Sequence, residues 1–349
     1  MRVFAKPFAA LLVATALLAG CARPLPEGVT ELTYATPYPP SHPFSLADQR
    51  WMDFVERESG GTLIIRPVWS GSLLSADMSM EELRHGVADI GLITPIYVRG
   101  GTHLLRTQTG FYSGADSIES QTALYRCMAA SIPQFGEELK GLEVLAVQGG
   151  LLPGIVTRGR QITSLNDLKG LRIRAPTELL GVLSELGVDP VNMPMGEVYS
   201  AMAKGVIDGV IAPPDTLRAL HLTEVAGYFY ELKVPRGAYP ARAMGKQRWN
   251  SLSAQQRALL ERSKPVWEAA LADEIRQSEQ IGREAGEGII TWSPASAADQ
   301  QHFDELYLRD GQANARDLER FGIDGIEAYR VARNSIAARD EVRCEGDDT

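Results

Sequence analysis

The sequence predicts an α/β protein with two lobes of similar local topology. The chain of 349 residues is too long for one ordinary hydrophobic core and about long enough for two. From Val29 onward, short strand-like runs alternate with helical patterns, as in mostly parallel sheets covered by helices. Residues 84–95 and 203–214 match weakly at a constant offset, each with a helix end, a glycine, a short strand and a proline. We therefore expect two lobes with one cleft between them.

The N-terminus has the layout of a secretory signal. Two basic residues precede an apolar run from Phe8 to Leu18, which is too short to cross a bilayer in the mature protein. The run leads to Leu-Ala-Gly and Cys21, and this resembles a bacterial lipoprotein cleavage site. We expect residues 1–20 to be removed, Cys21 to be lipidated and 21–28 to be a tether, which would place the protein in the periplasm, anchored to a membrane. The alternative is plain secretion with a free cysteine.

Charge and cysteine content limit the partners. The net charge is −9, and removing residues 1–20 deletes two positive charges, which argues against a nucleic-acid partner. No second apolar stretch approaches membrane-spanning length, so we expect the lipid alone to hold the protein on the membrane. Cys127 and Cys344 are candidates for a disulfide that an oxidising compartment would allow.

The first lobe is expected to start with a sheet and a proline-rich loop. Its predicted strands are 29–36, 62–69, 89–94 and 142–147, and its predicted helices are 45–59, 78–87 and 121–132. Prolines exclude both helix and central strand from 37–43. A loop of this kind at a strand end is a common wall of a binding site.

The same alternation restarts after Gly149. The predicted strands are 155–158, 171–174, 206–211, 228–234 and 238–244, and the predicted helices are 177–186, 196–204, about 251–287, 295–320 and 325–339. The long helix at 251–287 can lie along both lobes. Because the last two strands return across the lobes, we expect interleaved domains. The first would combine 29–149 with about 238–275, and the second 150–237 with the C-terminal helices to about 340.

One arginine stands out in this pattern. In the strand 171–174, Leu171 and Ile173 face one side and Arg172 and Arg174 the other, but only Arg174 lies at the strand exit. Ligands of open parallel sheets bind outside the carboxyl ends of strands, and a guanidinium fits two carboxylate oxygens. We predict that Arg174 holds a carboxylate. The alternative is an ordinary surface arginine packed on Pro176.

Three motifs together resemble the solute-binding proteins of TRAP transporters, of the C4-dicarboxylate-binding type. They are DLKGLRIRAP at 167–176, MPMGEVY at 193–199 and GVIDG at 205–209, and the similarity extends over nearly all of the mature chain. The resemblance implies a two-lobed clamshell of the periplasmic binding protein type with a long helix spanning both lobes. It also implies a carboxylate ligand on Arg174, membrane permease subunits as partners, and no enzymatic activity. We expect a monomer without a cofactor or a metal.

Further residues are candidates for lining the site. They lie in the proline-rich loop, at the ends of the two matching strands, in the second motif and in the last strand: His42, Thr94, Ala212, Pro213, Met195 and Tyr239. Each has a plainer alternative, such as a solvated histidine, a core methionine or a packed tyrosine. Asp215 would repel an acid, so we interpret it as a helix cap.

Two departures from the family pattern indicate an unusual ligand. The asparagine that commonly follows the Asp-Gly pair is absent, and Gly154 stands where a further arginine is often found. Fewer polar donors favour a ligand less polar than a sugar acid or a simple dicarboxylate. We expect a keto acid, or an aromatic or branched monocarboxylate.

Two other functions remain as alternatives. A secreted hydrolase or metal enzyme finds no support, because the five histidines are scattered and neither H-E-x-x-H nor G-x-S-x-G occurs. An ABC-type substrate-binding lipoprotein would share the clamshell and differ in its permease, so the sequence of the binding protein alone discriminates weakly against it.

Overall fold

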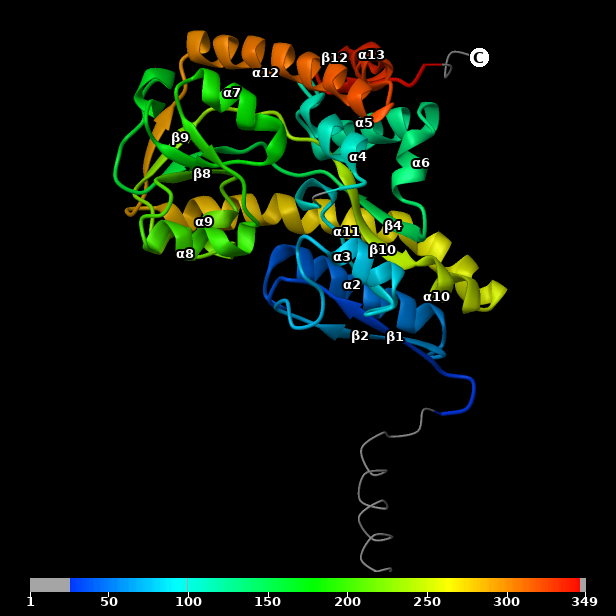
Figure 1. The fold of residues 1–349 in the computed structure, drawn as a ribbon. Helices are drawn as coiled ribbons and strands as arrows, with labels where there is room; N and C mark the ends of the chain where they lie inside the picture. The colour runs from blue at the N-terminus through cyan, green and yellow to red at the C-terminus, as the bar shows by residue number, and fades with distance from the viewer. Residues whose placement is uncertain (1–25, 99, 346–349) are drawn as a thin grey trace, which may run out of the picture.

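Two mixed sheets form the centres of two lobes in the computed structural model, which describes residues 26–98 and 100–345 (Figure 1). The predicted signal sequence, the predicted lipidation site Cys21 and most of the predicted tether lie outside the described residues. Within the described part, no helix combines the length and the apolar character needed to cross a bilayer. The predicted two-lobed α/β class is confirmed.

The first sheet has the strand order β2-β1-β3-β10-β4. Its strands are β1 (Thr30–Ala35), β2 (Leu63–Val68), β3 (Ile90–Leu92), β4 (Leu142–Gln148) and β10 (Tyr239–Gly245). β1 runs parallel to β2 and β3, whereas β10 is antiparallel to β3 and β4. Helices α2 (Pro43–Glu58), α3 (Ser79–Arg84), α4 (His103–Thr107), α5 (Ile118–Ser131) and α6 (Gln134–Glu138) belong to this lobe.

The second sheet has the order β11-β9-β5-β8-β6-β7. Its strands are β5 (Gly154–Thr157), β6 (Arg172–Arg174), β7 (Asp189–Val191), β8 (Gly209–Ala212), β9 (Tyr228–Glu231) and β11 (Thr291–Pro294). β5 is antiparallel to β8 and β9, and β6 is parallel to β7 and β8. The helices of this part are α7 (Leu180–Glu185), α8 (Val198–Ala203) and α9 (Thr216–Ala219), with 3-10 turns η3 (Leu165–Leu168), η4 (Thr177–Leu179), η5 (Met195–Glu197) and η6 (Leu222–Glu224).

Two chain segments cross between the lobes side by side. Residues 149–153 connect β4 to β5, and residues 232–238 connect β9 to β10. The backbone N–H of Val234 donates to the carbonyl of Pro153 at 3.0 Å, so the two segments are joined at the crossing. Because β4 and β10 pair antiparallel, as do β5 and β9, these two strand pairs continue through the crossing. We call residues 149–153 and 232–238 the crossing segments.

Helix α11 (Ala254–Gly286) lies along both lobes (Figure 1). It packs on α2 and β4 in the first lobe and on α9 in the second, and Trp267 stacks on Trp51 of α2 with ring centroids 3.6 Å apart. The helix begins later than predicted because Ser253 and Gln256 form a capping box, while Ser251 ends the preceding helix α10 (Lys246–Ser251). At Gly282 a side chain would meet the carbonyl of Pro214, so the helix directly supports the segment after β8.

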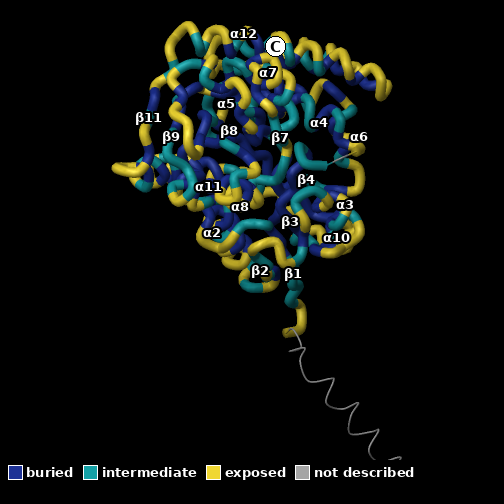
Figure 2. The backbone as a smooth tube through the Cα atoms, turned by 60° about the vertical axis from the view of Figure 1, so that its left-hand side comes forward, coloured by how far each residue is buried: buried dark blue, intermediate teal, exposed yellow. Residues whose placement is uncertain are grey.

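The C-terminal helices do not belong to the second lobe alone, contrary to our expectation. In α12 (Ala297–Asp317), Phe303 and Tyr307 join the core of the second lobe, whereas Ala315 joins that of the first. Helix α13 (Gly325–Ser335) packs on α5. With 21 residues, α12 is long enough to bridge the lobes. In Figure 1, α12 (orange) and α13 (red) cross the molecule on the side opposite α11. Figure 2 shows the buried parts in the interior of the molecule, on both sides of α11, and the exposed parts at its periphery.

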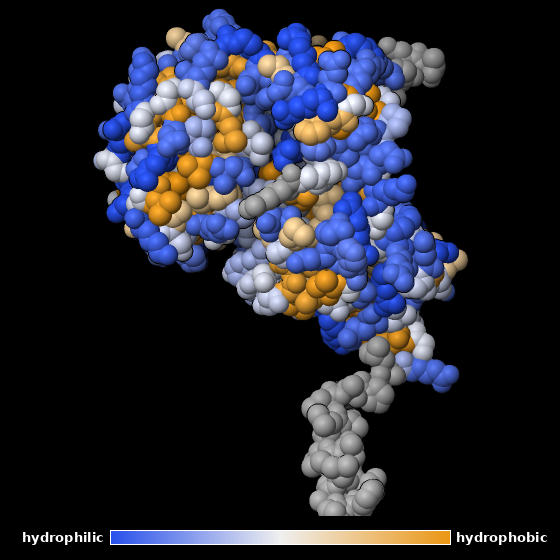
Figure 3. Space-filling model, in the orientation of Figure 1, coloured by the Kyte–Doolittle hydropathy of each residue, from blue (hydrophilic) through white to orange (hydrophobic). Residues whose placement is uncertain are grey.

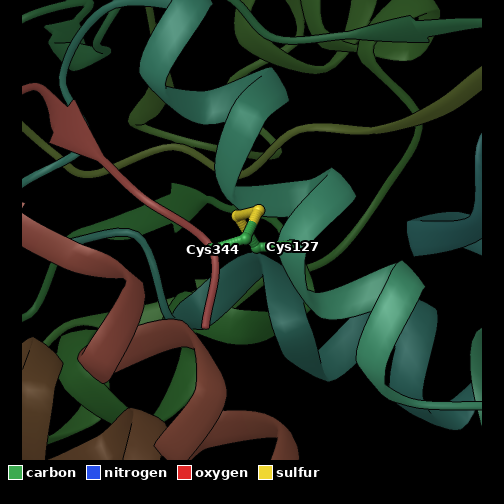
Figure 4. The surroundings of a disulfide bond; sticks show 2 residues. All are labelled: Cys127 and Cys344. Carbon is green, nitrogen blue, oxygen red and sulfur yellow. A yellow bond between two sulfur atoms is a disulfide. The ribbon is translucent and has the colours of Figure 1, made fainter. Parts of the chain in front are cut away.

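The chain after α13 turns back as a hairpin rather than continuing as the predicted helix. Strands β12 (Ile336–Ala338) and β13 (Glu341–Val342) are antiparallel. Asp340 at the turn accepts hydrogen bonds from the backbone N–H groups of Asp116 and Ser117 at 2.7 and 2.6 Å. The hairpin brings Cys344 to Cys127 of α5, and the two form a disulfide (Figure 4).

Removing this disulfide should lower stability. It closes a loop of 217 residues, and a cross-link of that length restricts the unfolded chain, so the Cys127→Ser/Cys344→Ser variant should lose about 2–4 kcal/mol of unfolding free energy. Urea unfolding followed by circular dichroism measures the loss. The single variant Cys344→Ser is the control and should match the double variant. An unchanged midpoint would show that the bond contributes nothing.

Candidate functional site

A cavity lies between the lobes and has walls from both. It encloses roughly 900 Å³ of empty space, including its open mouth. Apolar and aromatic side chains dominate its lining, among them Tyr38, Phe44, Ile96, Tyr97, Leu179, Met195, Ile211, Leu220 and Tyr239. Concave sites lined mainly by apolar side chains, with a few polar groups, are typical of small-molecule binding. The outer surface differs, since the face in Figure 3 is largely hydrophilic with small scattered hydrophobic patches.

Arg174 lies in this cavity at the end of β6. It is 3% exposed, so the alternative of an ordinary surface arginine is wrong. Its Nε donates to the carbonyl of Met193 at 2.8 Å, and its Nη2 donates to the Tyr97 hydroxyl at 2.7 Å. Tyr97 belongs to the 3-10 turn η1 (Pro95–Tyr97) of the first lobe, so this bond joins the two walls. Among the described residues no partner of Nη1 is found, which leaves that group for a ligand.

The neighbouring arginine of β6 has a different environment. Arg172 is exposed, its Nη2 donates to the carbonyl of Gly205 at 2.7 Å, and its Nε lies 3.6 Å from Asp208. Both arginines leave the sheet on the same side because strand side chains alternate. Only Arg174 stands where the strand ends beside the cleft. Position along the strand therefore decides the environment: Arg172 lies on the surface, and Arg174, at the strand end, lies in the cavity.

His42 is buried rather than solvated. It is 4% exposed, and its Nδ1 accepts the backbone N–H of Phe44 at 3.2 Å, capping α2. Its ring stacks on Tyr38 with centroids 4.0 Å apart. Burial, and next the positive charge of Arg242, lower its pKa to about 3. His42 is therefore neutral at physiological pH and adds no charge to the cavity that it lines.

The other predicted residues divide into four that line the cavity and one that does not. Thr94, Pro213, Met195 and Tyr239 are part of the lining. Ala212 is not: it is fully buried in the core of the second lobe beside Val156 and Phe229. Alternation along β8 and its exit turns Ile211 and Pro213 towards the cavity and Ala212 away from it. Placing Ala212 in the site was therefore wrong.

Sequence reasoning missed a second arginine. Arg236 lies in the second crossing segment and lines the cavity. Its guanidinium packs against Gly150 of the other segment, where a Cβ would lie 2.4 Å from Cζ. The signal for it was its position, since chain that crosses between lobes also forms the floor of their cleft. At Gly154 a side chain would collide with Phe229, so no residue there could supply the cation that Arg236 provides.

Asp215 is a cavity residue and not the expected helix cap. It occupies the N-cap position of α9, but its side chain makes no capping hydrogen bond. It is 6% exposed and lines the cavity, and burial raises its pKa to about 6. Glu178 also lines the cavity, and burial raises the pKa of its carboxyl to about 7. Two arginines and two carboxyl groups therefore share one largely apolar cavity.

The arrangement suits binding and offers no obvious chemistry. A buried guanidinium with a free face can fork onto a carboxylate, and the aromatic walls can cover an apolar body. Among the described residues no group of three or more His, Cys, Asp or Glu side chains could hold a metal ion. The one histidine in the lining, His42, is held neutral as a helix cap.

In both sequence and fold the chain is similar to bacterial binding proteins. The family described as bacterial extracellular solute-binding protein, family 7, matches residues 34–310. A TRAP solute-binding protein from Bordetella bronchiseptica, solved with bound (R)- and (S)-mandelate, has a TM-score of 0.77 and 21% identity, covering 88% of this chain and 98% of that one. A TRAP solute-binding protein from Rhodoferax ferrireducens, in complex with copurified benzoate, has a TM-score of 0.78 and 24% identity, with 88% and 98% covered. A monocarboxylate 2-oxoacid-binding periplasmic protein from Nostoc is 27% identical over 179 residues, 50% of this chain and 49% of its own length.

Proposed function

Because the chain belongs to family 7 of the bacterial extracellular solute-binding proteins, we propose that it captures an apolar monocarboxylic acid between its lobes and delivers it to a TRAP-type permease. The family binds substrates and is not enzymatic, so the hydrolase alternative is set aside. The observation that carries the proposal is Arg174, buried in the cavity with an unused face and bonded to Tyr97 of the opposite lobe. A carboxylate at Nη1 would add to this connection.

The lining supports an apolar ligand rather than a sugar acid or a simple dicarboxylate. The apolar and aromatic side chains outnumber the polar ones, and a ring or branched chain would bury against them. Two of the solved relatives were found with mandelate and benzoate, and the Nostoc relative is named for monocarboxylate 2-oxoacids. Each of these ligands combines one carboxylate with a compact body. An aromatic monocarboxylate fits this cavity on the same grounds.

Capture would proceed by closure of the lobes. The crossing segments and α11 are the connections about which the lobes would turn, and a ligand that touches both walls shifts the equilibrium towards the closed form. The bond between Arg174 and Tyr97 is one contact that separates when the lobes open. Gly282 of α11 packs so closely on Pro214 that α11 and the segment after β8 would move together during closure.

We also propose that the mature protein is a lipid-anchored periplasmic monomer. The support is the sequence alone, in the small residues before Cys21 and the absence of a second long apolar stretch. Partitioning of the mature protein into a detergent phase tests the anchor. An ABC-type partner remains the alternative, and ligand uptake driven by an ion gradient rather than by ATP distinguishes the two.

Calorimetric titration tests the ligand class. We expect benzoate and phenylacetate to bind purified protein with micromolar or better affinity and succinate to bind at least ten times more weakly. The physical reason is that the second carboxylate of succinate would be buried against apolar walls without a dedicated partner. Acetate, which has the carboxylate but no apolar body, is the matched control and should bind weakly. Tight binding of succinate with none of the aromatic acids would overturn the proposal.

A further inference from the structure

Asp215, a residue of the cavity wall, has a buried hydrogen-bonding atom without a partner. Among the described residues, its Oδ1 is buried and has no hydrogen-bond partner. The hydroxyl of the adjacent Thr216 is not available, since it donates to the carbonyl of Pro213 at 2.6 Å. Arg236 is close enough to favour the ionised carboxylate, yet the two form no ion pair within 4 Å in the described structure. Asp215 thus belongs to the cavity wall and keeps one buried acceptor that no protein group uses.

An acceptor in this state destabilises the empty protein. A buried polar atom without a partner loses its hydration and gains nothing in return, which is costly for a charged group. The raised pKa of Asp215 has the same cause, because burial disfavours its charged form. A leucine or asparagine of similar size would avoid most of this cost. An aspartate at this position is explained if a bound ligand donates the missing hydrogen bond to Oδ1.

We propose that Asp215 accepts a hydrogen bond from a hydroxyl group of the ligand, so that the protein selects hydroxylated apolar acids over their unsubstituted counterparts. This inference rests on the proposed capture of a monocarboxylate, with the carboxylate on Arg174 and the hydroxyl on Asp215. The ligand then has two polar groups: its carboxylate accepts hydrogen bonds from Arg174, and its hydroxyl donates one to Asp215. The apolar walls hold the part between them.

A neutral hydroxyl fits this subsite better than an ammonium group. Arg174 and Arg236 line the same cavity, and a cation placed beside Asp215 would be repelled by Arg236. A hydroxyl donates one hydrogen bond to Oδ1 without bringing a charge. Its oxygen can in turn accept from a nearby donor. Amino acids are therefore expected to bind poorly.

The experiment uses acids that differ by one group. Phenylacetate has no hydroxyl, mandelate has one beside the carboxylate, 3-hydroxyphenylacetate has one on the ring, and phenylglycine replaces the hydroxyl of mandelate by an ammonium. We expect wild-type protein to bind one of the hydroxylated acids about 10- to 100-fold more tightly than phenylacetate in calorimetric titrations, as for a hydrogen bond to a charged group. In Asp215→Ala the affinities for the hydroxylated acid and for phenylacetate should become about equal, so the preference is read as their ratio within the same variant.

The outcomes separate this inference from the proposed function. If phenylacetate binds but neither hydroxylated acid is preferred, or if the preference survives in Asp215→Ala, the assignment of Asp215 is overturned and the capture of monocarboxylates stands. If none of the acids binds, both fail. If phenylglycine binds most tightly, the group that Asp215 recognises is an ammonium and not a hydroxyl, and the proposal is overturned. Asp189→Ala, which removes an exposed carboxylate of the same lobe, is the charge-matched control and should keep the preference.

A second variant keeps the test independent of folding defects. Asp215→Asn preserves the size of the side chain and removes its charge. Burial raises the pKa of Asp215, so its ionised carboxylate lowers the unfolding free energy of the empty wild-type protein most above pH 6. This loss of stability becomes smaller as the pH falls and the carboxylate is protonated. Asp215→Asn should therefore have a higher melting temperature than wild type at pH 8 and a smaller difference at pH 4. Arg236 and Glu279, the charged neighbours of Asp215, are the same in both proteins. A lower melting temperature would mean that Asp215 has a structural partner and would overturn the proposal.

Discussion

Replacing Arg174 with lysine should weaken the binding of benzoate or phenylacetate about 10- to 100-fold and leave the fold intact. The guanidinium anchors itself by Nε on Met193 and by Nη2 on Tyr97, and it still presents Nη1 to the cavity. A lysine ammonium has no such fixed fork, so it cannot hold both walls and the ligand in one plane. A charge-assisted hydrogen bond contributes roughly 1.5–3 kcal/mol, which corresponds to this loss of affinity. Calorimetric titration of the variant measures it.

The neighbouring arginine provides the matched control. Arg172→Lys makes the same chemical change two residues earlier in β6, on an exposed side chain that bonds Gly205. Its affinity for the same acids should equal that of wild type. Unchanged affinity in Arg174→Lys, or an equal loss in both variants, would show that Arg174 is not the carboxylate anchor. Thermal unfolding of both variants separates a local loss of binding from a damaged fold.

Arg174 could be predicted because its position depends on short-range rules. Alternation along a strand and the location of the strand exit are both readable from a few residues, and the structure places Arg174 in the cavity. Ala212 shows the limit of the same rule. The predicted strand at 206–211 is observed as Gly209–Ala212, so Ala212 is the last strand residue rather than part of the exit, and alternation turns it away from the cavity that Ile211 and Pro213 line.

Arg236 and Asp215 required tertiary information. Arg236 reaches the cavity because two segments separated by about eighty residues of sequence cross side by side, and no local pattern reports that crossing. Asp215 follows a strand and precedes a helical turn, which is the ordinary setting of a cap. Only the burial of the carboxylate and its place in the cavity lining distinguish it from a cap.

The elements themselves were largely readable, whereas their long-range partners were not. Periodicity located the long helix and the strands of the first sheet, with boundaries that differ by a few residues, but in the second sheet it missed the two edge strands β7 and β11. The antiparallel direction of β5 and β10 depends on the crossing of the chain. The hairpin after α13 depends on Asp340 binding the backbone at Asp116 and Ser117. The two Asp340 contacts join residues more than two hundred positions apart, so the local sequence near Ser335 continued to favour a helix.

Replacing Asp48 with alanine should lower the unfolding free energy by about 3–5 kcal/mol. Asp48 is fully buried in α2, and its Oδ1 accepts from Nε of Arg242 at 2.9 Å and from Nε1 of Trp267 at 2.8 Å. Its Oδ2 accepts from the hydroxyl of Tyr34. Removing the carboxylate leaves a buried guanidinium without its counter-charge, and breaking one partner of a buried pair typically has this cost. Urea unfolding measures it, with the exposed Asp53→Ala of the same helix as a control that should change little.

A double-mutant cycle identifies the cause of this loss. If it comes from the unpaired charge of Arg242, then Asp48→Ala/Arg242→Met should be more stable than Asp48→Ala alone, because the second change removes the buried cation. If the losses of the two single variants simply add, the pair does not act as a unit. The pair also bears on binding, since the guanidinium of Arg242 lies 5.9 Å from the ring centroid of Phe44 in the cavity wall. Asp48→Ala/Arg242→Met should therefore unfold at a higher urea concentration than Asp48→Ala. Its affinity for phenylacetate should stay below that of wild type, because the guanidinium of Arg242 no longer supports Phe44 in the cavity wall.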